Sequence, residues 1–226
     1  MEKIPRYKKI INKIYYNIFI EFNRNQAIKF NFSNKKRWDL INEIIKKKKF
    51  KDYLEIGCDD NVLFDKINLP NKIGVDPREG GNIKKTSDDF FKSNNKFFDI
   101  IFIDGLHEFD QVNKDIENSV KFLNPNGFIL LHDCLPNKME LQAVPRYQLY
   151  WTGDVWKSIV KFRHNINLSI KTILMDMGVA VIQKKTNPNP LNLKIDDFKK
   201  LKFKDFYNHH NEYMNEISYD DFLKSI

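Results

Sequence analysis

The sequence has few cysteines, few glycines and no long hydrophobic run. Its two cysteines, Cys58 and Cys134, are too few for a disulfide framework or a zinc site. The most apolar stretch near the N-terminus, residues 10–22, is interrupted by polar side chains, and no small-residue cleavage site follows it. A membrane span needs about 20 apolar residues, so we expect no span and a cytoplasmic, reduced protein.

The remaining composition indicates a globular protein. At 226 residues, 42% of them hydrophobic, the chain is long enough to bury the core of one domain. Its net charge of +8 is uneven: residues 1–51 hold 15 Lys and Arg against 4 Asp and Glu, whereas the rest holds 23 against 26. Such a segment favours anionic partners, among them nucleic acid, phosphorylated substrates and a membrane surface. A solvated helical face is the alternative, because the basic residues alternate with apolar ones at helical spacing.

Two amphipathic helices are predicted within this basic segment. Over residues 7–22, apolar side chains recur at spacings of three and four. A second helix is expected to begin at Ser33 or Asn34 as its cap and to end in the lysines at 46–49. Covering a site and forming a homodimer interface are both open roles for these helices. We divide the chain into a basic helical extension (1–51), a central domain (52–186) and a helical tail (187–226) packed on that domain.

From residue 52 onward, short apolar runs alternate with helical patterns, which is typical of a mostly parallel sheet with helices on both faces. The predicted strands are 53–56, 72–75, 83–85, 99–103, 127–132, 172–176 and 179–183. Apolar residues from Phe109 to Leu123 predict a helix between the fourth and fifth strands. Gly178 separates the last two strands, which we expect to form an antiparallel hairpin. The fold class is thus α/β, a three-layer sandwich around a seven-stranded sheet.

A glycine turn and an acidic residue stand at the tips of the first two predicted strands. Gly57 follows the first strand, and a glycine there lets the backbone turn sharply and approach a ligand closely. Asp76 ends the next strand, 21 residues after Glu55, where a carboxylate can accept hydrogen bonds from two ribose hydroxyls. Together they indicate a ligand that contains a nucleoside. An ordinary strand–helix turn with a capping aspartate is the alternative.

These features belong to a series of segments that resembles the class I S-adenosylmethionine-dependent methyltransferases. The segments are Leu-Glu-Ile-Gly at 54–57, Ile-Gly-Val-Asp-Pro at 73–77, Thr-Ser-Asp-Asp-Phe-Phe at 86–91, Phe-Ile-Asp-Gly-Leu-His at 102–107 and Leu-His-Asp-Cys-Leu-Pro at 131–136. The resemblance covers residues 52–185, and its Rossmann-like topology has the same five parallel strands and hairpin. It implies that Glu55 and Gly57 border the methionine part of the cofactor. Asp76 would hold the ribose, and Asp88 would lie in the loop along the adenine.

The glycine turn departs from the Gly-x-Gly pattern of that family, because Asp59 and Asn61 follow Gly57. The acids Asp59 and Asp60 would repel the pyrophosphate of NAD, whereas S-adenosylmethionine carries no phosphate. The sequence therefore favours S-adenosylmethionine over a dinucleotide.

A second polar group stands at the tips of the fourth and fifth strands. Asp104 and His107 follow the fourth strand, and His132, Asp133 and Cys134 end the fifth. Because strand ends converge on the ligand crevice of an α/β sheet, we expect these residues to face the transferred methyl group. A histidine of near-neutral pKa suits a general base for a hydroxyl acceptor, and His107 is the candidate.

Related sugar and natural-product O-methyltransferases imply further roles for this group. In them, an arrangement like Asp104–His107 supplies a metal ligand and the base, and an acid placed as Asp133 helps to hold Mg²⁺. Asp104 could instead cap the next helix or contact the cofactor. His132 could be a hydrogen-bonded structural residue, and Cys134 is expected to be a small, partly buried one.

A third segment, residues 151–163, is also similar to this branch. Trp151 and Trp156 could stack on a sugar ring, and Lys157 or Arg163 could meet an anionic group. The alternative is an amphipathic helix that uses these side chains for packing. Both interpretations stay open for Trp156, and packing is favoured for the others.

The sequence thus predicts an enzyme that methylates a hydroxyl of a carbohydrate or small-molecule acceptor, with Mg²⁺ as a candidate second cofactor. A nucleic-acid methyltransferase would explain the basic segment. However, the Asp/Asn-Pro-Pro-aromatic motif of amino-methylating enzymes is absent at 104–107, and there is no Pro-Cys nucleophile for base-carbon chemistry. We therefore do not expect nucleic acid as a partner. A non-catalytic, methyltransferase-like subunit is disfavoured because the cofactor acid and a candidate base are both present.

Overall fold

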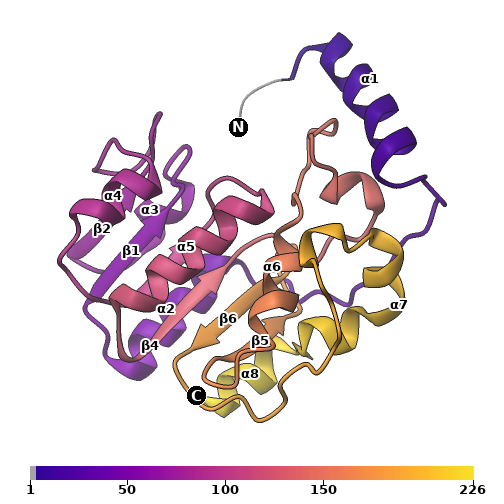
Figure 1. Ribbon diagram of the computed structural model, residues 1–226. Helices are drawn as coiled ribbons and strands as arrows, with labels where there is room; N and C mark the ends of the chain where they lie inside the picture. Colours follow the sequence, from indigo (N-terminus) through magenta and orange to yellow (C-terminus); the bar gives the residue numbers. More distant parts are fainter. Residues whose placement is uncertain (1–3) are drawn as a thin grey trace.

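The computed structural model describes residues 4–226 and contains one seven-stranded sheet with helices on both faces (Figure 1). The strands are β1 (Asp52–Ile56), β2 (Asn71–Val75), β3 (Phe98–Ile103), β4 (Leu123–Leu131), β5 (Ser169–Ile173), β6 (Val179–Gln183) and β7 (Glu216–Ile217). The α-helices are α1 (Arg6–Tyr15), α2 (Arg37–Lys48), α3 (Val62–Lys66), α4 (Ser87–Ser93), α5 (Phe109–Phe122), α6 (Val155–Phe162), α7 (Phe203–Met214) and α8 (Tyr219–Ser225).

The strand order is β2-β1-β3-β4-β6-β5-β7, and every neighbouring pair is parallel except the two that contain β6. The expected α/β class, the mostly parallel sheet and the antiparallel hairpin are thereby confirmed. Parallel strands need crossovers through helices, so the carboxyl ends of β1 to β4 all lie at one edge of the sheet. This edge is where the predicted polar residues stand.

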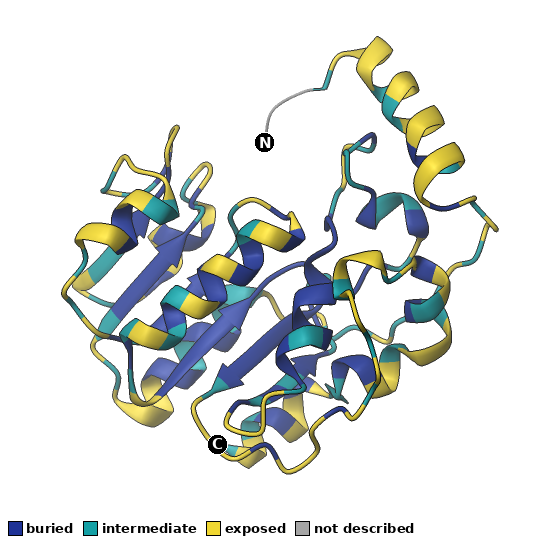
Figure 2. Ribbon diagram, viewed as in Figure 1, coloured by how far each residue is buried: buried dark blue, intermediate teal, exposed yellow. Residues whose placement is uncertain are grey.

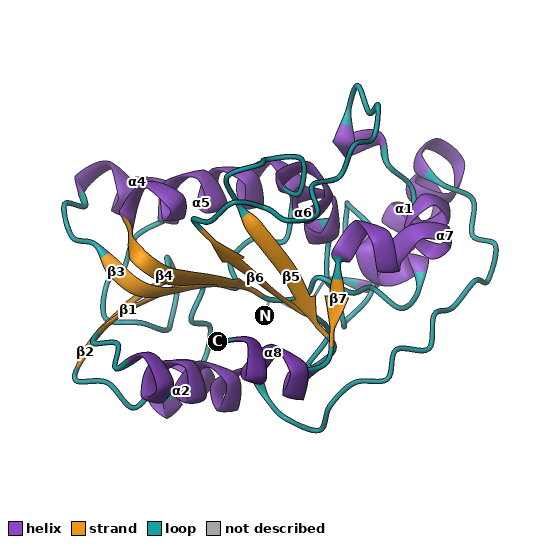
Figure 3. Ribbon diagram, turned by 90° about the horizontal axis from the view of Figure 1, so that it is seen from below, coloured by secondary structure: helices purple, strands orange, loops and turns teal. Residues whose placement is uncertain are grey.

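Two apolar clusters fix the sheet between its helices. Alternate residues of a strand point to opposite faces, and β3 divides accordingly: Ile101 and Ile103 pack with α4, α5 and α6, whereas Ile100 and Phe102 pack with α2, α3 and α8. Figure 3 shows α4, α5 and α6 on one side of the sheet and α2 and α8 on the other. A shift of one residue in β3 would exchange the two faces, so burial fixes the register of this strand.

Two predicted strands were wrong in extent. Residues 83–85 form no strand but a single bridge between Ile83 and Val75, because Thr86 already caps α4 by accepting a hydrogen bond from the Asp89 amide. The strand expected at 172–176 ends at Ile173, since Asp176 has a φ of 40° and begins the turn into β6. The seventh strand of the sheet is instead β7 in the tail, which the sequence analysis missed.

The N-terminal helices also differ from expectation. The helix expected over 7–22 consists of α1 followed by a turn of π-helix, Tyr16–Ile20. Helix α2 begins later than the expected cap at Ser33, because the Ser33 amide donates to the Leu174 carbonyl and this segment runs beside the sheet. Its end in an αL residue at Lys49 agrees with the expected lysine-rich terminus. Among residues 4–226, no helix has the length and apolar character needed to cross a bilayer.

Candidate active site

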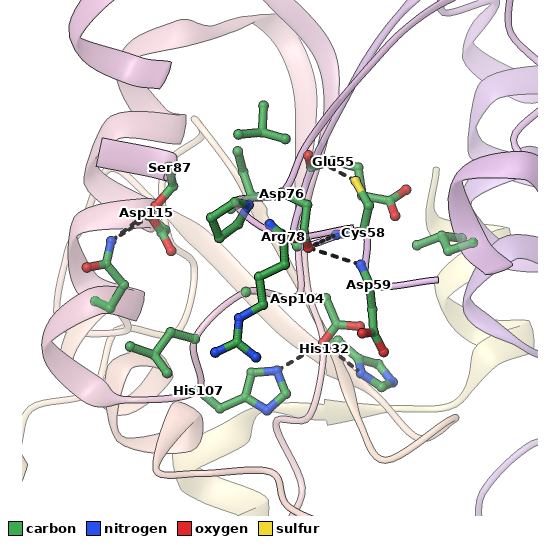
Figure 4. A pocket seen from close by; sticks show the side chains of 18 of the residues that line it. Glu55, Cys58, Asp59, Asp76, Arg78, Ser87, Asp104, His107, Asp115 and His132 are labelled. Carbon is green, nitrogen blue, oxygen red and sulfur yellow. Dashed lines mark hydrogen bonds and ion pairs between the residues drawn. The ribbon is translucent and has the colours of Figure 1, made fainter. Parts of the chain in front are cut away.

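One cavity of about 720 Å³ opens at the carboxyl ends of β1 to β4 (Figure 4). Its lining contains every residue that the sequence analysis assigned to cofactor, base or metal: Glu55, Gly57, Asp76, Asp88, Asp104, His107 and Asp133. Residues from four strand tips and from helices α4 and α5 thus meet in one place.

Gly57 holds the tips of β1 and β3 together. Its φ is +85°, and a Cβ there would lie 2.6 Å from the Asp104 carbonyl carbon and 2.7 Å from the Gly105 Cα. The Asp104 amide donates to the Ile56 carbonyl at 2.8 Å, which keeps the two loops in contact. Glycine is therefore required at position 57 by the protein's own backbone.

Asp76 organises the loops at the end of the cavity formed by the tips of β1 and β2. Its Oδ2 accepts from the amides of Cys58 and Asp59, both at 3.1 Å, and its Oδ1 accepts from Arg78 at 2.8 Å and Glu79 at 3.3 Å. Burial raises the pKa of Asp76, but these four backbone donors outweigh it and hold the pKa below its ordinary value. The carboxylate is therefore charged and fixed before any ligand arrives.

Asn61 takes the place of a glycine in this turn. Its φ is 67°, which asparagine tolerates better than most residues, and its Oδ1 accepts from the Gly81 amide at 2.7 Å. The side chain ties the β1 turn to the loop after β2. The departure from Gly-x-Gly thus has a structural reason, and Asp59 and Asp60 line the cavity beside it.

Glu55 is almost fully buried at the floor of the site. The Tyr53 hydroxyl donates to its Oε2 at 2.6 Å. Burial raises the pKa of Glu55 to about 8, and the hydrogen bond from Tyr53 opposes this only in part. In the protein without ligand, the Glu55 carboxyl is therefore protonated at neutral pH.

The far end of the cavity lies between α4 and α5. Asp88 accepts from Gln111 Nε2 at 3.0 Å, and this bond lowers the pKa of Asp88. The same amide donates to Asp115 at 3.1 Å, and burial raises the pKa of Asp115 to about 6. The sequence analysis missed Asp115, although it follows Val112 by three residues and so falls on the apolar face of α5.

The end of the cavity at the tips of β3 and β4 contains two histidines between two carboxylates. His107 Nε2 lies 3.1 Å from Asp104 Oδ1, and its Nδ1 lies 3.3 Å from Asp133 Oδ2. His132 Nδ1 lies 3.3 Å from Asp104 Oδ1 and 3.4 Å from Asp133 Oδ1. Each imidazole therefore contacts both carboxylates, and His132 is a hydrogen-bonded member of the same group.

The charges of this group stabilise one another. Although burial lowers it, the hydrogen bond to Asp104 and the charge of Asp133 raise the pKa of His107. The pKa of His132 is raised well above its usual range against the same effect of burial, mainly by the charges of Asp133 and Asp104. Burial opposes ionisation of Asp104, but the histidines hold its pKa well below the ordinary value. In the protein alone, the carboxylates favour protonated imidazoles.

Two further residues brace this group from distant parts of the chain. Arg37, at the start of α2, reaches Asp176 Oδ2 at 3.1 Å and lies 4.0 Å from Asp104. Its Nη1 is 3.4 Å from His132 Nε2. The sequence analysis missed both residues, since a basic residue in a basic segment and an acid in a hairpin turn carry no distinctive signal. A residue of the N-terminal extension thus forms part of the site.

The donor atoms suit a divalent cation. One ligand atom each of Asp104, His107 and Asp133 lies within 4.8 Å of the others. Two carboxylates on neighbouring strand tips, with room for water in the adjoining cavity, match the oxygen-rich coordination of Mg²⁺. The set that the sequence analysis suggested, Asp104 and Asp133, is therefore brought together.

The third sequence segment divides between site and core. Trp151 lines the cavity and stacks on His107, with ring centroids 5.5 Å apart. Trp156 is fully buried, donates to Gln142 Oε1 at 2.6 Å and packs on Phe206, so it cannot stack on a sugar. Lys157 and Arg163 are also buried and bind backbone carbonyls. Packing is thus the role of all but Trp151.

Known proteins share this architecture. Residues 72–134 match the family model of a methyltransferase domain. A Podospora anserina methyltransferase (PaMTH1), solved with S-adenosylhomocysteine (SAH), superimposes with a TM-score of 0.52 at 15% identity, over 82% of this chain and 98% of its own. The chain has a class I methyltransferase fold.

Two further solved structures resemble this methyltransferase fold. A putative O-methyltransferase from Klebsiella pneumoniae gives a TM-score of 0.52 at 10% identity, over 82% of this chain and 92% of its own. A putative caffeoyl-CoA O-methyltransferase from Staphylococcus aureus gives 0.50 at 15% identity, over 78% and 91%. No curated protein is significantly similar in sequence. The resemblance to class I methyltransferases in the sequence is confirmed.

Proposed function

We propose that this protein is an S-adenosylmethionine-dependent O-methyltransferase with His107 as its general base. The observation that supports this most strongly is the division of one cavity into two ends. A fixed carboxylate, Asp76, stands beside a glycine turn at one end, and Asp104, His107 and Asp133 meet at the other. Methyl transfer needs these two functions side by side: a place for the donor and a base for the acceptor.

The cofactor would lie along the tips of β1 and β2. Asp76 would share its oxygens with the ribose hydroxyls, and the longest of its present bonds, 3.3 Å from the Glu79 amide, is the easiest to give up. Glu55 and Gly57 would border the methionine part, Asp88 the adenine, and Asp104 the reacting end. The carboxylates of Asp59 and Asp60, which line the cavity, would not repel this cofactor, because it has no phosphate and carries a positively charged sulfonium.

In the reaction, an acceptor oxygen attacks the methyl carbon, the bond from carbon to sulfur breaks, and SAH leaves. His107 takes the hydroxyl proton, while Asp104 orients its ring through Nε2. Asp104 and Asp133 would hold Mg²⁺, which supplies positive charge that lowers the pKa of the acceptor hydroxyl and of His107. Because the carboxylates otherwise favour the protonated form of His107, base catalysis is expected to need that charge.

A hydroxyl acceptor is favoured over other nucleophiles. Two of the solved neighbours are described as putative O-methyltransferases, one of them of the caffeoyl-CoA type. Trp151 beside His107 offers a flat apolar surface for a sugar or an aromatic ring. We propose a small-molecule or carbohydrate acceptor, with vicinal hydroxyls as the best match to a metal-assisted site.

The test is methyl transfer from labelled S-adenosylmethionine to two probe acceptors, catechol for an aromatic diol and methyl glucoside for a sugar. We expect label in at least one of them, and about a hundredfold less with His107→Gln. His209→Gln, on an exposed face of α7, is the matched control and should transfer at the wild-type rate. Equal transfer by His107→Gln would remove His107 from the mechanism, and full activity in excess EDTA would exclude the metal.

A further inference from the structure

Helix α1 turns its polar side to the protein and its apolar side to solvent. Asn12 donates to the Arg146 carbonyl at 2.8 Å. Tyr16, at the start of the π-helical turn that follows α1, is 3% exposed, and Gln142 donates to its hydroxyl. A helix that packs on its own domain normally presents its apolar side to the core. The contacts of α1 are therefore reversed.

The outward side forms a continuous apolar stripe. It consists of Tyr7, Ile10, Ile11, Ile14 and Tyr15 of α1 and Ile18 of the π-helical turn that follows, all between 44% and 68% exposed. Spacings of three and four place these side chains on one face, and the exposed Phe19 and Phe22 continue the apolar surface beyond the helix. Figure 2 shows α1 almost entirely exposed and standing apart from the sheet, whereas α5 is exposed only on its outer side. A contiguous apolar surface of this kind marks an interaction site.

The charges around the apolar stripe are all of one sign. Between residues 4 and 20 there are four basic residues and no acid. At 3.6 residues per turn, Lys8 borders the stripe on one side, and Arg6 and Lys13 border it on the other. The next acid, Glu21, is buried and accepts from the Phe203 and Lys204 amides, so its charge is used inside the protein.

We propose that α1 is an interfacial helix that binds this protein to an anionic lipid surface. The apolar stripe enters the boundary between headgroups and acyl chains, and the flanking cations meet the lipid phosphates with their stems along the apolar surface. The helix lies in the plane of the surface and does not cross the bilayer. Because Arg146 both accepts the bond from Asn12 and lines the cavity, the bound protein holds the cavity close to the lipid.

A second copy of the chain fits this surface less well. A two-fold contact through the apolar stripe would bring the flanking cations Arg6, Lys8 and Lys13 of both copies into one interface, with no acid on α1 to compensate them. Like charges at close range weaken such a contact, whereas anionic headgroups complement the same charges.

The test is flotation with vesicles of phosphatidylcholine alone and of an equimolar mixture with phosphatidylglycerol. We expect the full chain to float with the anionic vesicles and to lose binding as salt rises. Ile14→Asp combined with Ile18→Asp should lower the bound fraction about tenfold or more, and Lys8→Gln with Lys13→Gln by about tenfold. Ile166→Asp, an equally exposed isoleucine outside α1, is the matched control and should bind as the wild type does.

Sedimentation velocity of the same proteins without lipid tests the alternative, in which a second copy of the chain covers the apolar stripe. The proposal predicts no change of oligomeric state on Ile14→Asp with Ile18→Asp. It is wrong if the wild type fails to float with anionic vesicles, or if the double variant floats like the wild type. A dimer that this variant dissociates, with no vesicle binding, would assign the apolar stripe to a second copy.

Discussion

The two ends of the cavity are held in different ways. At the end formed by the tips of β1 and β2, Asp76 is fixed by backbone amides from the loops after these strands, at most 18 residues away in sequence. At the end formed by the tips of β3 and β4, imidazoles hold Asp104 and Asp133, and Arg37 contacts Asp104 while it binds Asp176, 139 residues away in sequence. The first end is a local turn that two sequence segments define. The second is a network of side chains that exists only when the N-terminal extension and the β5–β6 turn fold onto the sheet.

The largest expected effect is on metal binding, which should depend on the end of the cavity at β3 and β4 and not on the end at β1 and β2. Replacing Asp104 and Asp133 together by asparagine should weaken the binding of Mn²⁺, a spectroscopic probe for Mg²⁺, by about a hundredfold, because the anionic ligands are lost. SAH should still bind, since its contacts lie mainly at the other end. Asp115→Asn, which removes a buried acid elsewhere in the cavity, is the control for Mn²⁺. Unchanged Mn²⁺ binding in the double variant would exclude the metal site.

A second change examines the long-range network. Arg37→Gln should lower the free energy of unfolding by about 2 kcal/mol, because Asp176 and Asp104 lose a partly buried counter-charge. Lys36→Gln, its neighbour with a largely exposed side chain, should change stability by less than about 0.5 kcal/mol. Chemical denaturation measures both. If the two variants were equally stable, Arg37 would be a surface cation and not part of the site.

A pH series examines Glu55, which is buried at the floor of the cavity beside the tips of β1 and β2. The pKa of Glu55 rises from 4.5 in an unfolded chain to about 8 in the protein. The stability that this shift contributes is fully present below pH 4.5, the pKa in the unfolded chain, and is lost as pH rises toward about 8. In this range the unfolded chain releases the proton of Glu55, whereas the folded protein keeps it. The wild-type Tm should therefore fall more steeply than that of Glu55→Gln over this window. Parallel curves in a thermal-shift series would contradict the shift.

The contrast between the ends also explains what the sequence could predict. Gly57, Asp76 and the strand-tip group were found because each stands directly after an apolar strand, and parallel strands end at one edge of the sheet. Arg37 and Asp176 were not found, since their partners depend on tertiary contacts that no local pattern encodes. The four backbone amides that donate to Asp76 were also not predicted, because amides of any residue type can donate such hydrogen bonds. The strand predicted at residues 83–85 was wrong for a similar reason, because the cap of α4 at Thr86 begins directly after it.

We propose above all that the end of the cavity at β1 and β2 binds S-adenosylmethionine through Asp76. Calorimetric titration with SAH tests it directly, using wild type, Asp76→Asn and His107→Gln. Asp99→Asn is the matched control, since Asp99 also accepts backbone amides, those of Lys51 and Asp52, but at the start of β3 on the opposite edge. We predict that His107→Gln and Asp99→Asn bind SAH like the wild type and that Asp76→Asn binds about a hundredfold more weakly. Equal binding by a folded Asp76→Asn protein would contradict the account.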